Sequence, residues 1–164
     1  MEMGGKMELG KHYRIDEIVA HAAPMQLLDE LIAYDVESIV VGVTVRSDSE
    51  FCMPGVGVPA WVGMEYMAQT VGAFSGIEEV QAGLRPQIGL LLGSRRYRST
   101  VDVFPIGARL QVTACMQLRD ENNLVCFDCE IQMNGAPVAT GDLKAVRPKN
   151  VLELVSAGSD VTQR

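Results

Sequence analysis

A single carboxylate inside an apolar stretch is the first candidate for chemistry. Glu65 lies in the run AWVGMEYMAQTVGAF, residues 60–74, where almost every other side chain is apolar or small. A helix over this run places Trp61 one turn before Glu65 and Gln69 one turn after it. A carboxylate in such surroundings is costly unless it is hydrogen-bonded or faces a cleft. Glu65 is therefore either a general acid or base, or a structural residue held by an arginine at a pocket rim or subunit seam.

A loop rich in glycine and proline precedes this carboxylate. Its residues with special backbone geometry are Pro54, Gly55, Gly57 and Pro59. Proline suits the first position of a helix, because its missing N–H has no partner there in any case. Free N–H groups at a helix start can stabilise negative charge on a carbonyl oxygen. The donors expected for such a carbonyl clamp are those around Trp61, Val62 and Gly63. The simpler interpretation is that the glycines serve backbone geometry alone.

The chain contains two histidines, His12 and His21. His21 precedes Pro24 and the apolar run MQLLDELI, so it is either a packed, hydrogen-bonded residue or a catalytic base. His12 belongs to the N-terminal lead-in, where we expect it to be exposed.

The sequence SRRYR, residues 94–98, is the one dense basic cluster. On a strand, Arg96 and Arg98 would share one face, and Arg95 and Tyr97 the other. The cluster either guards a solvated edge strand with charge or docks an acidic or phosphate-bearing partner.

Length and composition exclude several classes of protein. The chain has 164 residues, with 14 basic and 21 acidic side chains and a net charge of −7, which argues against general nucleic-acid binding. No apolar run is long enough to cross a membrane, and the N-terminus lacks the apolar core of a secretory signal. Four scattered cysteines indicate reduced thiols, and the CxxC pair Cys126 and Cys129 would face opposite sides of a strand, so we predict no metal site. A cytoplasmic protein with one domain is expected.

The order of predicted elements indicates an α+β fold. We expect a helical turn near 13–20, a strand at 36–47, and a buried helix from Ala60 to about Ala82 that ends at Gly83. Four strand-like segments follow, and we expect them to form an antiparallel meander. They are 87–98, 109–119, 123–133 and 137–147. An antiparallel sheet of about five strands wrapped around one long helix is the hot dog fold. The predicted domain covers 11–148, between a flexible lead-in at 1–10 and a tail at 149–164.

The stretch FCMPGVGVPAWVGMEYMAQTVGAFSG, residues 51–76, resembles the signature of bacterial 3-hydroxyacyl-acyl carrier protein dehydratases of the hot dog superfamily. The matching features are Pro54-Gly55, Glu65 and Ala68-Gln69. HAAPMQLLDELIAYD at 21–35 and VDVFPIGARL at 101–110 are similar to two further family elements, so the resemblance spans roughly 12–147. The segments VPAWVGMEYMAQ and IGLLLGSRRY look most like the dehydratases of aryl-polyene and related biosynthetic clusters.

The resemblance implies that a 3-hydroxyacyl thioester is dehydrated to the enoyl thioester. Glu65 would then transfer the proton, His21 would be the second catalytic group, and Gln69 would orient Glu65 or the substrate hydroxyl. Gly55 and Gly57 would shape the approach of the substrate. One departure matters: the better-known dehydratases carry a catalytic histidine fourteen residues before the acidic residue, and this position is Phe51 here.

The resemblance also implies partners and leaves two alternatives open. The implied partners are acyl carrier protein, docked on Arg95, Arg96 and Arg98, and a second copy or a related hot dog subunit, with no nucleic acid. No cofactor is implied beyond the phosphopantetheine of the carrier, or coenzyme A, that bears the substrate. The alternatives are an acyl thioesterase, in which a helix carboxylate uses water, and a non-catalytic subunit that binds the carrier protein or completes another dehydratase.

Overall fold

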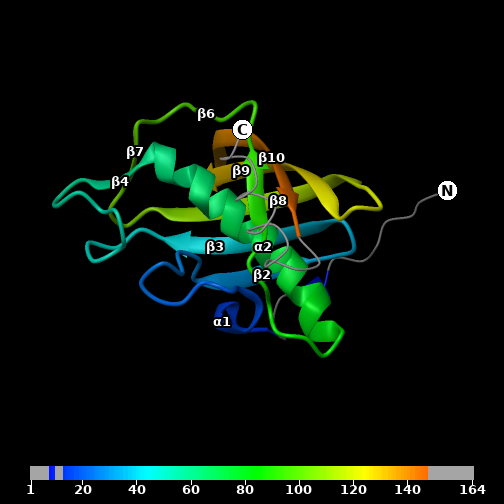
Figure 1. Ribbon diagram of the computed structural model, residues 1–164. Helices are drawn as coiled ribbons and strands as arrows, with labels where there is room; N and C mark the ends of the chain where they lie inside the picture. Colours follow the sequence, from blue (N-terminus) through cyan, green and yellow to red (C-terminus); the bar gives the residue numbers. More distant parts are fainter. Residues whose placement is uncertain (1–7, 10–12, 148–164) are drawn as a thin grey trace, which may run out of the picture.

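A computed structural model describes residues 8–9 and 13–147. Its main feature is one antiparallel sheet with the strand order β1-β2-β3-β8-β9-β10-β5, in which β6 also pairs with β10. A long helix, α2 (Gly63–Gln81), lies across one face of the sheet (Figure 1). The strands of the sheet are β1 (Glu8–Leu9), β2 (Glu30–Tyr34), β3 (Ser38–Thr44), β5 (Leu90–Gly93), β6 (Arg98–Ser99), β8 (Arg109–Arg119), β9 (Leu124–Met133) and β10 (Ala136–Val146). This arrangement confirms the predicted hot dog fold, with more strands than the five or so expected.

Helix α2 begins and ends close to the predicted residues. A 3-10 turn over Ala60–Val62 leads directly into it. The helix ends at Gln81, and Gly83 follows with a φ of +77°, a left-handed conformation that glycine adopts without strain. Most faces of the helix are buried, as its uniform apolarity predicted. For example, the ring of Phe74 packs edge-on against Phe127 of β9, with centroids 5.4 Å apart.

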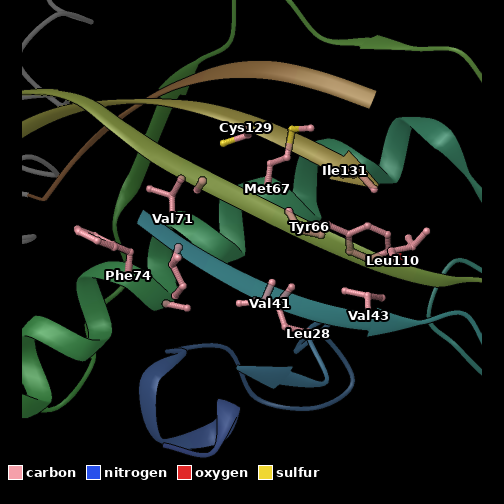
Figure 2. Packing of buried hydrophobic residues seen from close by; sticks show 14 of the residues in the cluster. Leu28, Val41, Val43, Tyr66, Met67, Val71, Phe74, Leu110, Cys129 and Ile131 are labelled. Carbon is pink, nitrogen blue, oxygen red and sulfur yellow. The ribbon is translucent and has the colours of Figure 1, made fainter. Parts of the chain in front are cut away.

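The hydrophobic core fills the space between α2 and the sheet (Figure 2). Strand β9 contributes one of its two faces to this core. Its side chains alternate between a buried and a more exposed face, as expected for a strand that packs on a core from one side. The inward row is Val125, Phe127, Cys129 and Ile131. Burying a side chain of this size contributes about 1.5–3 kcal/mol. Cys126 lies on the other face of β9 from Cys129, as the CxxC spacing predicted.

The segment 87–98 differs from the prediction in two ways. It is not one strand, because the carboxylate of Asp142 accepts the backbone N–H groups of Arg95 and Arg96, each at 2.8 Å, and removes them from a sheet ladder. The strand alternation predicted for this cluster therefore fails. The segment also does not open a meander, since β5 pairs with β10 at the far edge. Residues 94–108 connect β5 to β8, which lies on the other side of β9 and β10 in the sheet, so the two strands do not form a hairpin.

Three further segments complete the comparison with the sequence. The predicted helical turn is α1 (Ile15–Ile18). The apolar run after Pro24 contains β2, a strand that the sequence analysis missed, and β1 pairs with β2, so the sheet begins inside the expected lead-in. The expectations for 1–7, for His12 and for the tail at 149–164 lie outside the described residues. Across 8–9 and 13–147, no helix has the length and apolarity to cross a membrane.

Candidate active site

Glu65 and His21, the two predicted catalytic residues, lie next to each other. Glu65 is in the first turn of α2, and His21 is in the segment that follows α1. His21 Nε2 lies 4.0 Å from Glu65 Oε1, and the two side chains are 35% and 40% exposed. This separation exceeds the 2.7–3.2 Å or so of a direct hydrogen bond but is too short for an oxygen atom to lie in line between the two groups, so a substrate hydroxyl could contact both only from the side.

Gln69 holds the carboxyl group of Glu65 in place. Its side chain is buried, and Nε2 donates to Glu65 Oε1 at 3.0 Å and to the carbonyl of Met25 at 2.7 Å. Its Oε1 accepts the N–H of Leu27 at 2.9 Å. One amide group therefore contacts the carboxyl group and ties the segment after His21 to the helix. This is the geometry that the predicted orienting role requires, and the role itself stays a prediction.

The Glu65–His21 pair sits at one end of a groove of about 280 Å³. Small residues of α2 form its floor, residues 19–21 form one wall, and 87–91 with the adjacent ends of β9 and β10 form the other. The floor residues are Ala68, Gly72 and Ser75. At the opposite end, Arg119 Nη2 meets Glu78 Oε2 at 2.9 Å. Glu65 and Glu78 are separated along the helix by about 20 Å, so the groove can accommodate an extended acyl chain.

The predicted carbonyl clamp is only partly available, and it does not line this groove. The N–H of Ala60 donates to the carbonyl of Asp102 at 2.9 Å, and the N–H of Gly63 donates to the carbonyl of Ala60 inside the 3-10 turn. Gly63 therefore drops out as a donor, and so does Val62, because the i→i−3 pattern of the 3-10 turn places its N–H on the carbonyl of Pro59. Of the three expected donors Trp61 remains, and it does not line the groove within the single chain.

The two loop glycines have backbone roles. Gly57, in β4 (Gly57–Pro59), has a φ of +148° and pairs with β7 (Val103–Pro105). A Cβ at this position would lie 2.1 Å from the carbonyl oxygen of Phe104, so only glycine fits. Gly55 adopts a φ of +72° with open space around it. Neither glycine lines the groove that holds Glu65.

An aromatic pair stands where the better-known dehydratases carry their histidine. Phe51 is exposed, and its ring packs edge-on against Trp61, with centroids 6.0 Å apart. Its φ of +65° is a left-handed conformation that is uncommon for a large side chain. His21 is therefore the single histidine that the described part of the chain offers to the site.

The arginine cluster is anchored to β10: Arg95 and Arg96 lie on a loop, and Arg98 begins β6. Besides the two backbone N–H groups, Asp142 Oδ1 accepts the hydroxyl of Ser94 at 3.2 Å. These hydrogen bonds, led by the one from the Arg96 N–H, hold the pKa of Asp142 below its usual value. The guanidinium groups of Arg95, Arg96 and Arg98 are exposed and form no ion pair with any described residue.

Sequence reasoning missed one residue near the site. Tyr97 donates its hydroxyl hydrogen to the carbonyl of Ala60, at the start of the helical segment that carries Glu65. The only signal in the sequence was an aromatic residue inside a basic cluster, which does not predict this contact. Across the described ranges, no three His, Cys, Asp or Glu side chains gather as a metal site.

Comparisons with known proteins find dehydratases. The ApeP-like family, described as ApeP dehydratase, matches residues 13–156. FabZ, a 3-hydroxyacyl-[acyl-carrier-protein] dehydratase from Agrobacterium fabrum, is 28% identical over 140 residues, which cover 79% of this chain and 84% of the relative. The dehydratase heterocomplex ApeI:P from Xenorhabdus doucetiae matches with 30% identity and a TM-score of 0.80, over 90% of this chain and 98% of the matched chain.

A more distant match shows the fold alone. A hypothetical thioesterase with coenzyme A from Streptococcus pneumoniae TIGR4 matches with 14% identity and a TM-score of 0.53, over 71% of this chain and 86% of that chain. The other comparisons confirm the resemblance to dehydratases of the aryl-polyene type. Since the family match covers nearly all of the described residues, this chain belongs to the ApeP-like family of dehydratases.

Proposed function

We propose that this chain takes part in the dehydration of 3-hydroxyacyl thioesters carried by acyl carrier protein, with Glu65 and His21 as the proton-transfer pair. The observation that carries the proposal is the pair itself. A carboxyl group and an imidazole meet 4.0 Å apart at one end of a groove that can take an acyl chain. Both groups are partly exposed, so a substrate can reach them.

The reaction needs a base and an acid at adjacent carbon atoms. A base removes the proton from the carbon next to the thioester carbonyl. The electron pair forms the new carbon–carbon double bond as the bond from the next carbon to its hydroxyl oxygen breaks. An acid protonates that oxygen, which leaves as water. Glu65 and His21 can serve these two steps from one side of the substrate, since their reactive atoms lie 4.0 Å apart and both side chains are partly exposed. This chemistry calls for no cofactor beyond the phosphopantetheine or coenzyme A that bears the substrate.

We propose that the working unit includes a second hot dog subunit, either a copy of this chain or a related protein. Strand β5 supports this proposal, because it ends the sheet and exposes three leucines in succession. Their exposed fractions are 39% for Leu90, 46% for Leu91 and 59% for Leu92. An exposed apolar edge strand is a ready template for pairing with another chain. The ApeI:P structure is itself described as a heterocomplex.

The role of a non-catalytic subunit is the second candidate function, and Phe51 favours it. If the family's loop histidine comes from a partner, this chain contributes Glu65 and the groove to a shared site. The thioesterase alternative has no support beyond the shared fold. We further propose that the exposed guanidinium groups of Arg95, Arg96 and Arg98 receive the acidic carrier protein, and that the protein works in the cytoplasm.

One experiment separates these functions. The purified chain, alone and mixed with a candidate partner subunit, is incubated with a 3-hydroxyacyl carrier thioester, and the loss of water is followed by mass spectrometry. Loss of water with the chain alone indicates a self-sufficient dehydratase, and loss only in the mixture indicates a shared site. Release of free carrier thiol without loss of water identifies a thioesterase. An intact substrate in every mixture refutes the proposed reaction.

Glu65→Gln tests the role of the carboxyl group. The amide has nearly the same shape but cannot exchange a proton, so turnover should fall by about 100-fold or more. The thermal unfolding temperature should stay close to that of the wild type, which circular dichroism measures. Normal turnover in this variant would make Glu65 a structural residue.

A further inference from the structure

The start of the helical segment that carries Glu65 has no side-chain cap. Neither the 3-10 turn over Ala60–Val62 nor α2 has a side-chain hydrogen bond at its N-terminal cap. Helices usually hold their first turn in place with such a bond from Ser, Thr, Asp or Asn. Here Pro59 and Val62 occupy the two cap positions, and neither side chain can accept a hydrogen bond. The position of the first turn must therefore be set by contacts from elsewhere in the fold.

Two long-range hydrogen bonds meet at Ala60, the first residue of this turn. Its N–H donates to the carbonyl of Asp102 at 2.9 Å, and its carbonyl accepts the hydroxyl of Tyr97. Both partners belong to the connection between β5 and β8. This connection therefore binds both backbone polar groups of Ala60, the N–H and the carbonyl. Of the two, the bond from Tyr97 is the one made by a side chain.

The ring of Tyr97 is itself fixed between β10 and the helix start. A Cβ added to Gly63 would lie 2.2 Å from Tyr97 Oη, so a glycine is needed for the ring to reach Ala60. On the other side, a Cβ added to Gly141 of β10 would lie 3.4 Å from Tyr97 Cδ2. The neighbouring N–H groups of Arg95 and Arg96 are held by Asp142, also in β10. The phenol therefore links a central strand to the first turn of the helix.

We propose that Tyr97 is a positioning residue for the dehydration proposed above, on which this inference rests. Its hydroxyl fixes the first turn of the helical segment and therefore the place of the Glu65 carboxyl group relative to His21. Burial raises the pKa of Tyr97 to about 12, so the hydroxyl keeps its proton at neutral pH and acts as a fixed donor. Gln69 orients the end of the Glu65 side chain, whereas Tyr97 fixes the backbone from which that side chain extends.

Tyr97→Phe removes the hydroxyl and keeps the ring between Gly63 and Gly141. Small misplacements of a catalytic group lower the rate steeply, so we expect kcat to fall by about tenfold to a hundredfold while KM changes by less than about twofold. Tyr13→Phe is the matched control. Tyr13 packs against Tyr34 of β2, with ring centroids 6.0 Å apart, and its loss of a hydroxyl should leave kcat unchanged. Equal losses in both variants, or a change in KM alone, would overturn the proposal.

A second measurement tests the positioning even if the chain shows no dehydratase activity. Hydrogen exchange of the amides at 60–65, followed by mass spectrometry, should become faster in Tyr97→Phe and stay the same in Tyr13→Phe. Gly63→Ala should give the same faster exchange, because its Cβ displaces the Tyr97 hydroxyl. The double variant should be no worse than Gly63→Ala alone, since both changes remove one hydrogen bond. Unchanged exchange in Tyr97→Phe would refute the positioning, whereas an inactive wild-type chain with faster exchange in the variant would refute only the proposed reaction.

Discussion

Replacing Gln69 by leucine should weaken both the fold and the site, and the structure allows the size of the effect to be worked out. The change keeps a buried side chain of similar length but deletes three hydrogen bonds, to Glu65, Met25 and Leu27. A neutral hydrogen bond contributes about 1 kcal/mol and one to a charged group about 1.5–3 kcal/mol. The buried apolar surface of leucine offsets part of this lost free energy, so the net decrease in the free energy of unfolding should be about 3 kcal/mol.

Thermal unfolding followed by circular dichroism measures this loss. For a chain of this size, about 3 kcal/mol lowers Tm by about 6–12 °C. Gln132→Leu is the matched control, because Gln132 makes one hydrogen bond, to Glu130 Oε1 at 2.8 Å, on the outer face of the sheet. Its effect should stay below about 0.5 kcal/mol. Equal shifts of Tm in the two variants would refute the view that Gln69 ties residues 25–27 to the helix.

Three other predictions concern the carrier surface, the packing of α1 and the response to pH. Replacing both Arg96 and Arg98 by alanine should weaken carrier binding at low salt, and equal affinity measured by titration calorimetry would discard the docking proposal. Gly76→Ala should destabilise the fold by about 1–3 kcal/mol, because its Cβ would lie 1.8 Å from the carbonyl oxygen of Ile18; an unchanged urea midpoint would contradict this contact. The lowered pKa of Asp142 means that its stabilising effect is present above about pH 4 and is lost as the pH falls through its folded pKa. In Asp142→Asn, the free energy of unfolding should therefore fall less steeply below about pH 4 than in the wild type. The same dependence of this free energy on pH in both proteins would show that the carboxylate contributes nothing.

The elements with strong local patterns were predictable from the sequence. The helix from Ala60 to Gln81 is apolar on most faces and ends before a glycine, and both features are local. The hairpin between β9 and β10 was predictable because Asn134 and Gly135 adopt the positive φ angles that a tight turn needs. Each of these segments carries its structural information within a few residues.

What could not be predicted depends on contacts between distant residues. Strand β5 pairs with β10 because that edge of the sheet is open to it, and the residues of β5 themselves do not indicate which strand it will pair with. The same holds for Arg95 and Arg96, whose N–H groups bind a carboxylate 46 or 47 residues away. For the site, the helical spacing of Glu65 and Gln69 predicted their contact, whereas the approach of His21 required the fold. The clamp donors were overestimated because the 3-10 turn uses the N–H groups of Val62 and Gly63, and the carbonyl of Asp102 takes that of Ala60.

Gly72, in the floor of the groove, gives this protein a way to change its capacity without changing its fold. A Cβ at this position would meet no atom within 4 Å, so a larger side chain extends into the groove and does not displace the core. Replacing glycine by alanine inside a helix also gains up to about 1 kcal/mol of helix stability. Most substitutions that narrow a binding site lower stability, but here the two effects run in opposite directions. A single substitution at this position can therefore narrow the groove with no compensating change elsewhere.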